Sequence, residues 1–178
     1  VESIQDLGQG FNKVVVAQIE TRDKHPNADR LSVCRVNNGQ EVLQIVCGAQ
    51  NMKAGDKVAL SQVGANLPNG MKIEKGKIRD VESFGMLCSE VELGIAKESP
   101  GILILPQDAP VGKPLAEFLG YDDIILELNI TPNRGDVLSH IGFAREVAAL
   151  LSLSLKYPTA APASKKGVGT VKVALEDE

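Results

Sequence analysis

The sequence is poor in aromatic residues, because its 178 residues include no Trp, two Tyr and four Phe. It also lacks any apolar run of the roughly 18–20 residues that a membrane helix needs, which excludes a membrane-spanning chain. Its 17 Gly and nine Pro predict many turns. We therefore expect a soluble globular chain with a core of Val, Ile and Leu, and no membrane partner.

Cysteine is scarce and unpaired by pattern. The three cysteines, Cys34, Cys47 and Cys88, are an odd number and show no Cys-x-x-Cys spacing. This argues against a disulfide framework and against a thiolate zinc site, and it predicts a reducing, cytoplasmic location.

Signals for catalysis are missing as well. The sequence has no glycine-rich phosphate loop, and its two histidines, His25 and His140, are far apart. We interpret residues 25–29 as a turn capped by short polar side chains, and His140 as a solvated helix residue. The acidic pairs at 90/92 and 122/123 are expected to face water. The sequence thus predicts no catalytic residue, no metal site and no cofactor bound by this chain, which favours a binding or assembly module.

Charge is unevenly distributed along a chain whose net charge is −4. Residues 1–79 carry 11 Lys/Arg against 8 Asp/Glu, whereas residues 80–146 carry 4 against 12. Within residues 51–79 the balance is 6 basic to 2 acidic. A local basic face on an acidic chain can meet a phosphate backbone, because screening limits electrostatic interactions to about 10 Å. A solvated surface is the alternative interpretation.

Short strands dominate the first 105 residues, and Asn37-Asn38-Gly39-Gln40 between two apolar runs predicts a hairpin. Frequent short strands indicate a small β-barrel. The predicted strands are Asn12–Glu20, Leu31–Val36, Glu41–Val46, Lys57–Val63, Met71–Ile78, Gly85–Ser89 and Ile102–Leu105.

After Pro106 the pattern changes to mixed structure. Pro114–Leu119 predicts a short helix, because Pro stands at its start and Gly120 follows its end. Ile124–Ile130 predicts a strand, and Val137–Leu151 predicts a helix that Asp136 or Ser139 could cap. A Pro/Ala/Ser/Lys linker follows, and Thr170–Leu175 predicts a strand that begins a further domain. We therefore expect this chain to be a piece of a longer protein.

Several stretches together resemble a known family. The sequence resembles the tRNA-binding OB-fold domain at residues 25–31 (HPNADRL), 44–51 (QIVCGAQN), 63–68 (VGANLP) and 81–90 (VESFGMLCSE). It also resembles the bacterial phenylalanyl-tRNA synthetase beta chain at residues 99–106 (SPGILILP), 130–136 (ITPNRGD) and 138–146 (LSHIGFARE). Small departures from the usual pattern occur at Gln50, Phe84 and residues 135–137.

The resemblance implies a fold and its domain boundaries. It implies a mostly β chain with some α, in which a five-stranded OB-fold β-barrel is inserted into a second, split α+β domain that is only partly present. Residues 1–10 would end the first half of the split domain, and 11–120 would form the tRNA-binding-type barrel. Residues 121–157 would be the return segment, a strand plus a helix, and 158–178 the linker and the start of the next domain.

The resemblance also implies a function. The parent would be a phenylalanine–tRNA ligase that charges tRNA in the cytoplasm with ATP and magnesium, built from two alpha and two beta chains. This part would be a non-catalytic tRNA-binding or assembly module. The alternative is a stand-alone tRNA-binding protein built on the same barrel. Residues 131–150 distinguish the beta chain from this alternative.

The chemistry of RNA binding can be narrowed from the residues. OB folds bind single strands through basic grooves and stacked aromatics, but the strand-rich residues 11–105 offer only Phe11 and Phe84. Contacts to phosphate and ribose are therefore expected, weak and sensitive to salt. The RNA-binding candidates are Lys53, Lys72, Lys75, Lys77 and Arg79. A role in assembly alone stays open.

Overall fold

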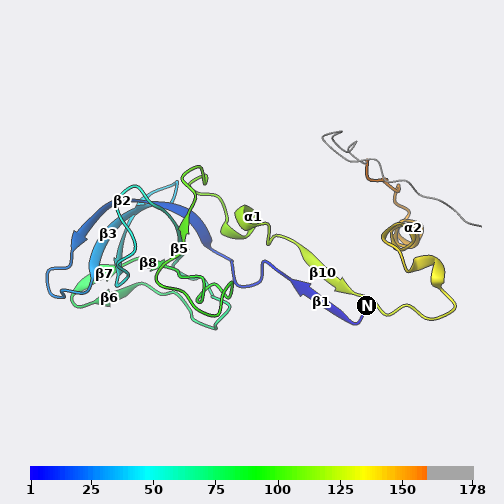
Figure 1. Ribbon diagram of the computed structural model, residues 1–178, viewed down its shortest axis with the longest axis horizontal. Helices are drawn as coiled ribbons and strands as arrows, with labels where there is room; N and C mark the ends of the chain where they lie inside the picture. Colours follow the sequence, from blue (N-terminus) through cyan, green and yellow to red (C-terminus); the bar gives the residue numbers. More distant parts are fainter. Residues whose placement is uncertain (160–178) are drawn as a thin grey trace, which may run out of the picture. The chain divides into compact units, whose positions relative to one another are not determined.

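The computed structural model describes residues 1–159. Contacts divide the chain into two compact units, Val1–Leu128 and Asn129–Glu178. Strands dominate the first unit, and the described part of the second contains a helix (Figure 1). The prediction of a mostly β chain with some α is confirmed. The strand predicted at Thr170–Leu175 lies outside the described residues.

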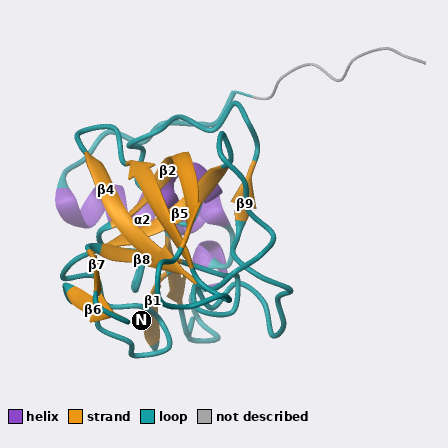
Figure 2. Cartoon of the chain, turned by 90° about the vertical axis from the view of Figure 1, so that its left-hand side faces the viewer, coloured by secondary structure: helices purple, strands orange, loops and turns teal. Residues whose placement is uncertain are grey.

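The first unit is built on a six-stranded antiparallel sheet (Figure 2). The strands follow the order β4-β3-β2-β5-β8, and β9 pairs with β5. The bounds are Val14–Lys24 for β2, Ser32–Asn37 for β3, Val42–Cys47 for β4, Lys57–Gln62 for β5, Gly85–Leu87 for β8 and Ile104–Leu105 for β9.

The long strand β2 serves two neighbours in succession. Its first part, from Val14 to Gln18, pairs with β5, and its second part, from Gln18 to Lys24, pairs with β3. A register shift against β3 between Ile19 and Thr21 marks a bulge, and a bulge bends a strand. Val16 also exchanges backbone hydrogen bonds with residues 112 and 113, so this part is paired along both edges. Every residue from Val14 to Ile19 is buried or half-buried, which explains an apolar run that does not alternate.

The two edges of the sheet approach each other without a strand ladder in the described residues. The N–H of Phe84 donates to the Gln44 carbonyl at 2.9 Å, and the N–H of Val46 donates to Ser83 Oγ at 3.0 Å. The prediction of a closed five-stranded barrel is therefore not confirmed. The strand that would close it, β8, has only three residues, because the chain before it forms a separate hairpin.

That hairpin consists of β6 (Gly76–Ile78) and β7 (Val81–Ser83). The strand predicted over Met71–Ile78 is wrong in extent, since only its last three residues pair in β6. Residues 64–73 instead fold back on themselves: Ile73 and Ala65 are joined by a 2.9 Å backbone hydrogen bond. The turn residues Asn69 and Gly70 supply the reversal.

The core of the first unit is aliphatic, as expected, and forms two clusters. One contains Phe11, Val14, Val16, Ala59, Ala65, Leu67, Ile73, Cys88, Leu93, Leu105, Ala109 and Leu115. The other contains Ala17, Ile19, Cys34, Val36, Ile45, Cys47, Met52, Val58, Leu60, Leu87 and Ile102. All three cysteines are thus core residues.

The ends of the first unit meet in a two-stranded ribbon. Strand β1 (Ser3–Asp6) pairs antiparallel with β10 (Ile124–Glu127), which is shorter than the predicted Ile124–Ile130. Between the sheet and β10, helix α1 (Leu115–Leu119) ends at Gly120 in a left-handed conformation, as predicted. Phe11 and Tyr121 pack edge to face, with ring centroids 5.6 Å apart.

The described part of the second unit contains a short 3-10 helix η1 (Gly135–Val137) and helix α2 (His140–Leu151). The helix predicted from Val137 therefore begins three residues later. Ser139, one of the two expected caps, accepts a hydrogen bond from the Gly142 N–H and ends the irregular segment.

Candidate nucleic-acid interface

The β6–β7 hairpin carries the centre of the candidate surface. Its strands pair from Gly76–Ser83 to Ile78–Val81, which leaves Arg79 and Asp80 as the two turn residues. Both have positive φ, 49° and 72°. Two-residue hairpins favour such turns, but residues with side chains pay about 1–2 kcal/mol each in this region. The turn therefore needs support from its surroundings.

His25 supplies that support from the turn after β2. His25 is only 3% exposed, and its Nδ1 accepts a hydrogen bond from the Asn27 N–H at 3.0 Å. Because Nδ1 is an acceptor, we assign the ring proton to Nε2, which donates to the Ile78 carbonyl at 3.1 Å. Asn27 Nδ2 also donates to the Arg79 carbonyl at 3.4 Å. No pattern in the sequence predicts this role of His25, whose ring joins two turns that are far apart in the chain.

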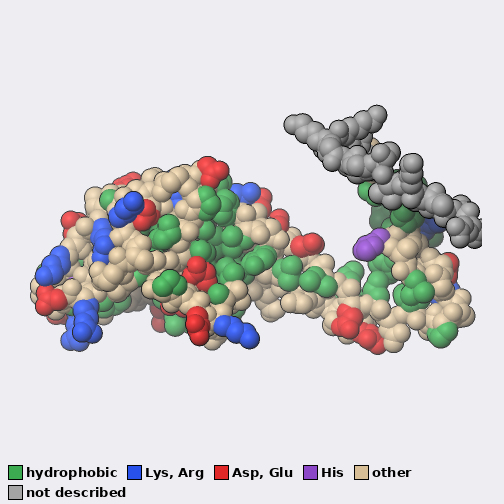
Figure 3. Space-filling model, in the orientation of Figure 1, with side chains coloured by type: hydrophobic (Ala, Val, Ile, Leu, Met, Phe, Trp, Pro, Cys, Tyr) green, Lys and Arg blue, Asp and Glu red, His purple; other side chains and the backbone are tan. Residues whose placement is uncertain are grey.

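Several basic side chains gather over β6, β7 and the end of β2 (Figure 3). Three of them are in ion pairs: Lys24 with Asp29 at 3.0 Å, Lys75 with Glu82 at 3.0 Å and Lys77 with Asp80 at 3.6 Å. All three pairs are exposed, and such pairs contribute little to stability. Their effect is to neutralise part of the basic surface.

The predicted RNA-binding residues thus differ in availability. In residues 1–159, Lys75 and Lys77 have acidic partners, whereas Lys53, Lys72 and Arg79 form no ion pair. Four of the five lie on the continuous segment that contains the hairpin. Lys53 belongs to another turn, between β4 and β5, where its N–H donates to Asp56 at 2.8 Å.

A cleft of about 570 Å³ opens beside the hairpin in the first unit. Ile73, Met86 and Ile102 line its apolar part, and Lys72 and Glu74 contribute charge. Lys75 lies nearby in sequence and places its Nζ 4.7 Å from the centroid of the Phe84 ring. Phe84 is therefore already covered by a cation, which disfavours it as a platform for base stacking.

The cysteine thiols are not suited to nucleophilic chemistry. Burial raises the pKa of Cys34 and of Cys88 to about 11, and burial also raises the pKa of Cys47 despite a hydrogen bond from the Ala49 backbone. All three remain protonated near neutral pH. They act as small apolar core residues.

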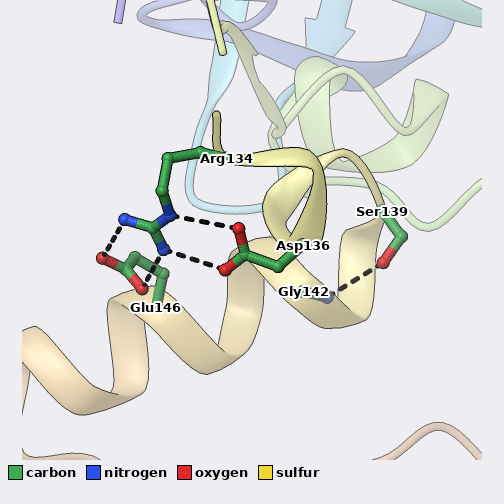
Figure 4. A network of polar contacts seen from close by, with 5 residues as sticks. All are labelled: Arg134, Asp136, Ser139, Gly142 and Glu146. Atoms are coloured by element: carbon green, nitrogen blue, oxygen red, sulfur yellow. Dashed lines mark hydrogen bonds and ion pairs between the residues drawn. The ribbon is translucent and has the colours of Figure 1, made fainter. Parts of the chain in front are cut away.

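A network of charged groups orders the start of α2 (Figure 4). Arg134 contacts Asp136 at 3.0–3.1 Å and Glu146 at 2.8–3.2 Å, each through two hydrogen bonds. These bonds hold the pKa of both carboxyls below their usual values. The network joins the irregular segment to the helix, and both carboxylates pair with the Arg134 guanidinium. This arrangement indicates a structural role for Arg134.

The described residues contain no group of three or more His, Cys, Asp or Glu arranged to hold a metal ion. Across the same residues, no helix combines the length and apolar character required to cross a membrane.

Comparison with known proteins identifies the domain. A family model described as a putative tRNA binding domain matches residues 14–114, more than half of the chain. The chain therefore belongs to this family of tRNA-binding domains.

Curated relatives extend the similarity beyond that domain. The chain is 58% identical to the phenylalanine–tRNA ligase beta subunit of Geobacter metallireducens, over 94% of this chain and 21% of that protein. It is 57% identical to the subunit of the same name from Fusobacterium nucleatum, over 89% and 20%. For Pseudomonas fluorescens the values are 46%, 97% and 22%. The resemblance to this beta chain is confirmed, and the chain spans about a fifth of the length of these relatives.

Two solved structures show weaker similarity. A MetRS related protein from Pyrococcus horikoshii has a TM-score of 0.45 at 21% identity, covering 61% of this chain and 94% of that one. The C-terminal domain of Plasmodium vivax p43 has a TM-score of 0.41 at 20% identity, covering 56% of each chain.

Proposed function

We propose that this chain is the N-terminal part of a phenylalanine–tRNA ligase beta subunit and serves there as a non-catalytic tRNA-binding module. The observation that carries the proposal is the match of residues 14–114 to the tRNA-binding domain family. Relatives named as beta subunits align over 89–99% of this chain, well beyond that domain. This extent favours the beta subunit over a stand-alone tRNA-binding protein.

The parent enzyme would charge tRNA with phenylalanine at the expense of ATP, with magnesium, in the cytoplasm. Its subunits would be two alpha and two beta chains, and ATP and magnesium would be handled by the alpha chain. Three buried, unbridged cysteines in this chain support a reducing compartment.

For the architecture we propose an OB-fold barrel over residues 11–120 that closes between β4 and β8. The hydrogen bonds from Phe84 to Gln44 and from Val46 to Ser83 support closure at this seam. We further propose that residues 1–10 end the first half of a split domain, that 121–157 are its return segment, and that 158–178 are a linker and the start of the next domain. The pairing of β1 with β10 supports this division, because it joins segments on both sides of the barrel.

The RNA contact would be made to phosphates by the basic segment that includes Lys72, Lys75, Lys77 and Arg79, with Lys53 contributing from its own turn. Folded RNA is then read by charge and shape. The expected affinity is that of non-specific contacts, a Kd of about 10⁻⁴–10⁻⁶ M.

Titration of labelled tRNA with the purified chain across a range of salt concentrations tests the proposal. The triple variant K75Q/K77Q/R79Q should weaken binding and flatten the salt dependence, because each lost phosphate contact removes about one released counterion. The matched control K97Q/K113Q/K156Q changes the net charge equally outside this segment, and it should retain the wild-type slope. Equal loss in both variants, or no binding at low salt, would assign the module to assembly.

The same preparation should show no phenylalanine-dependent pyrophosphate exchange. Exchange above the background of a preparation free of host enzyme would contradict a non-catalytic role.

A further inference from the structure

The tip of the β6–β7 hairpin has little support of its own. The hairpin forms a separate two-stranded sheet, and an isolated two-stranded hairpin is marginally stable in water. Its turn also holds Arg79 and Asp80 at positive φ, where a side chain is unfavourable. Strain of this kind persists only when neighbouring groups hold it, and it often accompanies function.

Among the described residues, two groups of contacts hold the hairpin to the rest of the first unit. At the base, Gln44 Nε2 donates to the Glu82 carbonyl at 2.9 Å, and the Val46 N–H donates to Ser83 Oγ at 3.0 Å. At the tip, the contacts come from His25 to the Ile78 carbonyl at 3.1 Å and from Asn27 to the Arg79 carbonyl at 3.4 Å. The shorter bond at the tip is therefore the one from His25.

The orientation of the His25 ring is fixed from both sides. Its Nδ1 accepts from the Asn27 backbone, so Nε2 must carry the proton and act as a donor. The ring is almost completely buried, which excludes competing water. The His25 ring therefore forms a rigid link between the 25–31 turn and the hairpin tip.

Arg79 directly follows Ile78, the residue whose carbonyl accepts the His25 hydrogen bond. It is exposed, and within residues 1–159 its guanidinium has no ion pair, unlike Lys75 just before the hairpin and Lys77 on β6. An unpaired arginine on a rigid turn binds phosphate at a lower entropic cost than one on a mobile loop.

We propose that His25 is a positioning residue that locks the Arg79–Asp80 turn and thereby directs the Arg79 guanidinium to an RNA phosphate. This rests on the proposed tRNA-binding function and names the residue pair that carries much of it. Loss of His25 should then act on RNA binding through Arg79.

Four variants in the full 178-residue chain test the proposal by tRNA titration against salt. R79Q should weaken binding several-fold and lower the salt slope by about one. H25L should do the same, although it changes no surface charge, and H25L/R79Q should be no weaker than R79Q alone. H25Q should restore binding in part, because its amide can donate to the Ile78 carbonyl.

A second set of variants tests the role of backbone strain and controls for unfolding of the domain. Glycine at position 80 accepts a positive φ without cost, so the effect of H25L should shrink when it is measured in the D80G background. Asn27 is exposed, and N27A removes only the longer tip contact, the hydrogen bond to the Arg79 carbonyl. N27A should therefore weaken binding slightly with the fold intact. Amide NMR of residues 76–83 in H25L should show loss of order at the hairpin and native signals elsewhere.

The outcomes separate the two proposals. If wild-type chain binds no tRNA at low salt, the proposed function fails, while the NMR measurement still decides whether His25 holds the tip. If H25L and N27A bind tRNA with the wild-type affinity and slope, the positioning role is overturned. Additive losses in H25L and R79Q would likewise overturn it.

Discussion

Lys75 is held between two partners: its Nζ lies 3.0 Å from the Glu82 carboxylate and 4.7 Å from the centroid of the Phe84 ring. The register of the hairpin creates this arrangement, because Lys77 and Glu82 are opposite each other and Lys75 lies just before the paired region. Both partners hold the ammonium on the protein surface. Lys75 is therefore less available to RNA than its charge alone indicates.

Replacement of Glu82 by Gln should consequently tighten tRNA binding. The change removes a carboxylate that repels phosphate and frees the Lys75 ammonium, so the salt slope should become steeper by up to about one released counterion. The measurement is the same tRNA titration against salt. E98Q, which makes the same charge change at an exposed residue in another loop, should have a smaller effect. If E82Q and E98Q are indistinguishable, the ion pair does not limit binding.

Gly85 should be intolerant of a side chain at the seam where β8 meets β5. It has a φ of +149°, and a Cβ there would approach the Ser61 carbonyl oxygen to 2.5 Å. G85A should lower the free energy of unfolding by roughly 1–3 kcal/mol through overpacking, as measured by urea unfolding.

Gly55 is the matched control, because its φ is +93° but no atom lies within 4 Å of the Cβ position. G55A therefore reports the cost of the backbone conformation alone, about 1 kcal/mol. An equal loss in both variants would show that the Ser61 contact is relieved without cost.

Local chemistry explains which features the sequence could predict. The hairpin after β3 was predictable because Asn38 Oδ1 accepts from the backbone N–H groups of Gln40 and Glu41 and Gly39 takes a positive φ. The same holds for Ser139 as the cap of α2 and Gly120 as the end of α1. Each depends on residues within a few positions of one another.

The candidate site depends on distant contacts, and for that reason much of it was not predictable. His25 and the Ile78 carbonyl are 53 residues apart, and no periodicity links them. The ion pairs of Lys75 and Lys77 follow from a three-residue strand whose register is invisible in a run predicted as one longer strand. The sequence could propose the basic segment but not which of its cations are paired.

The buried thiols should make stability fall at alkaline pH. The pKa of Cys34 and of Cys88 is raised from 9.0 to about 11 by burial, so the folded state favours the protonated form. Their stabilising contribution is complete below pH 9.0, where both states are protonated, and is lost as the pH rises toward about 11.

Urea unfolding across this pH window measures the effect, and C34A/C88A provides the comparison. The double variant should be less stable at neutral pH, because it loses buried volume, but its stability should fall less steeply with pH. Parallel curves for wild type and variant would assign the alkaline loss to other groups.

Arg134 should control the titration of two carboxyls at the start of α2. Its hydrogen bonds lower the pKa of Asp136 from 3.8 and that of Glu146 from 4.5. Their contribution to order is thus complete above these ordinary values and is lost as the pH falls through the lowered ones. Lysine cannot make two bidentate pairs at once, so R134K should return both carboxyl titrations toward their ordinary values in NMR.

The control is R145K, because the side chain of Arg145 forms a 3.4 Å hydrogen bond to the Tyr157 hydroxyl. R145K should leave both carboxyl titrations unchanged. Unaltered titrations in R134K would show that the paired geometry does not persist in solution.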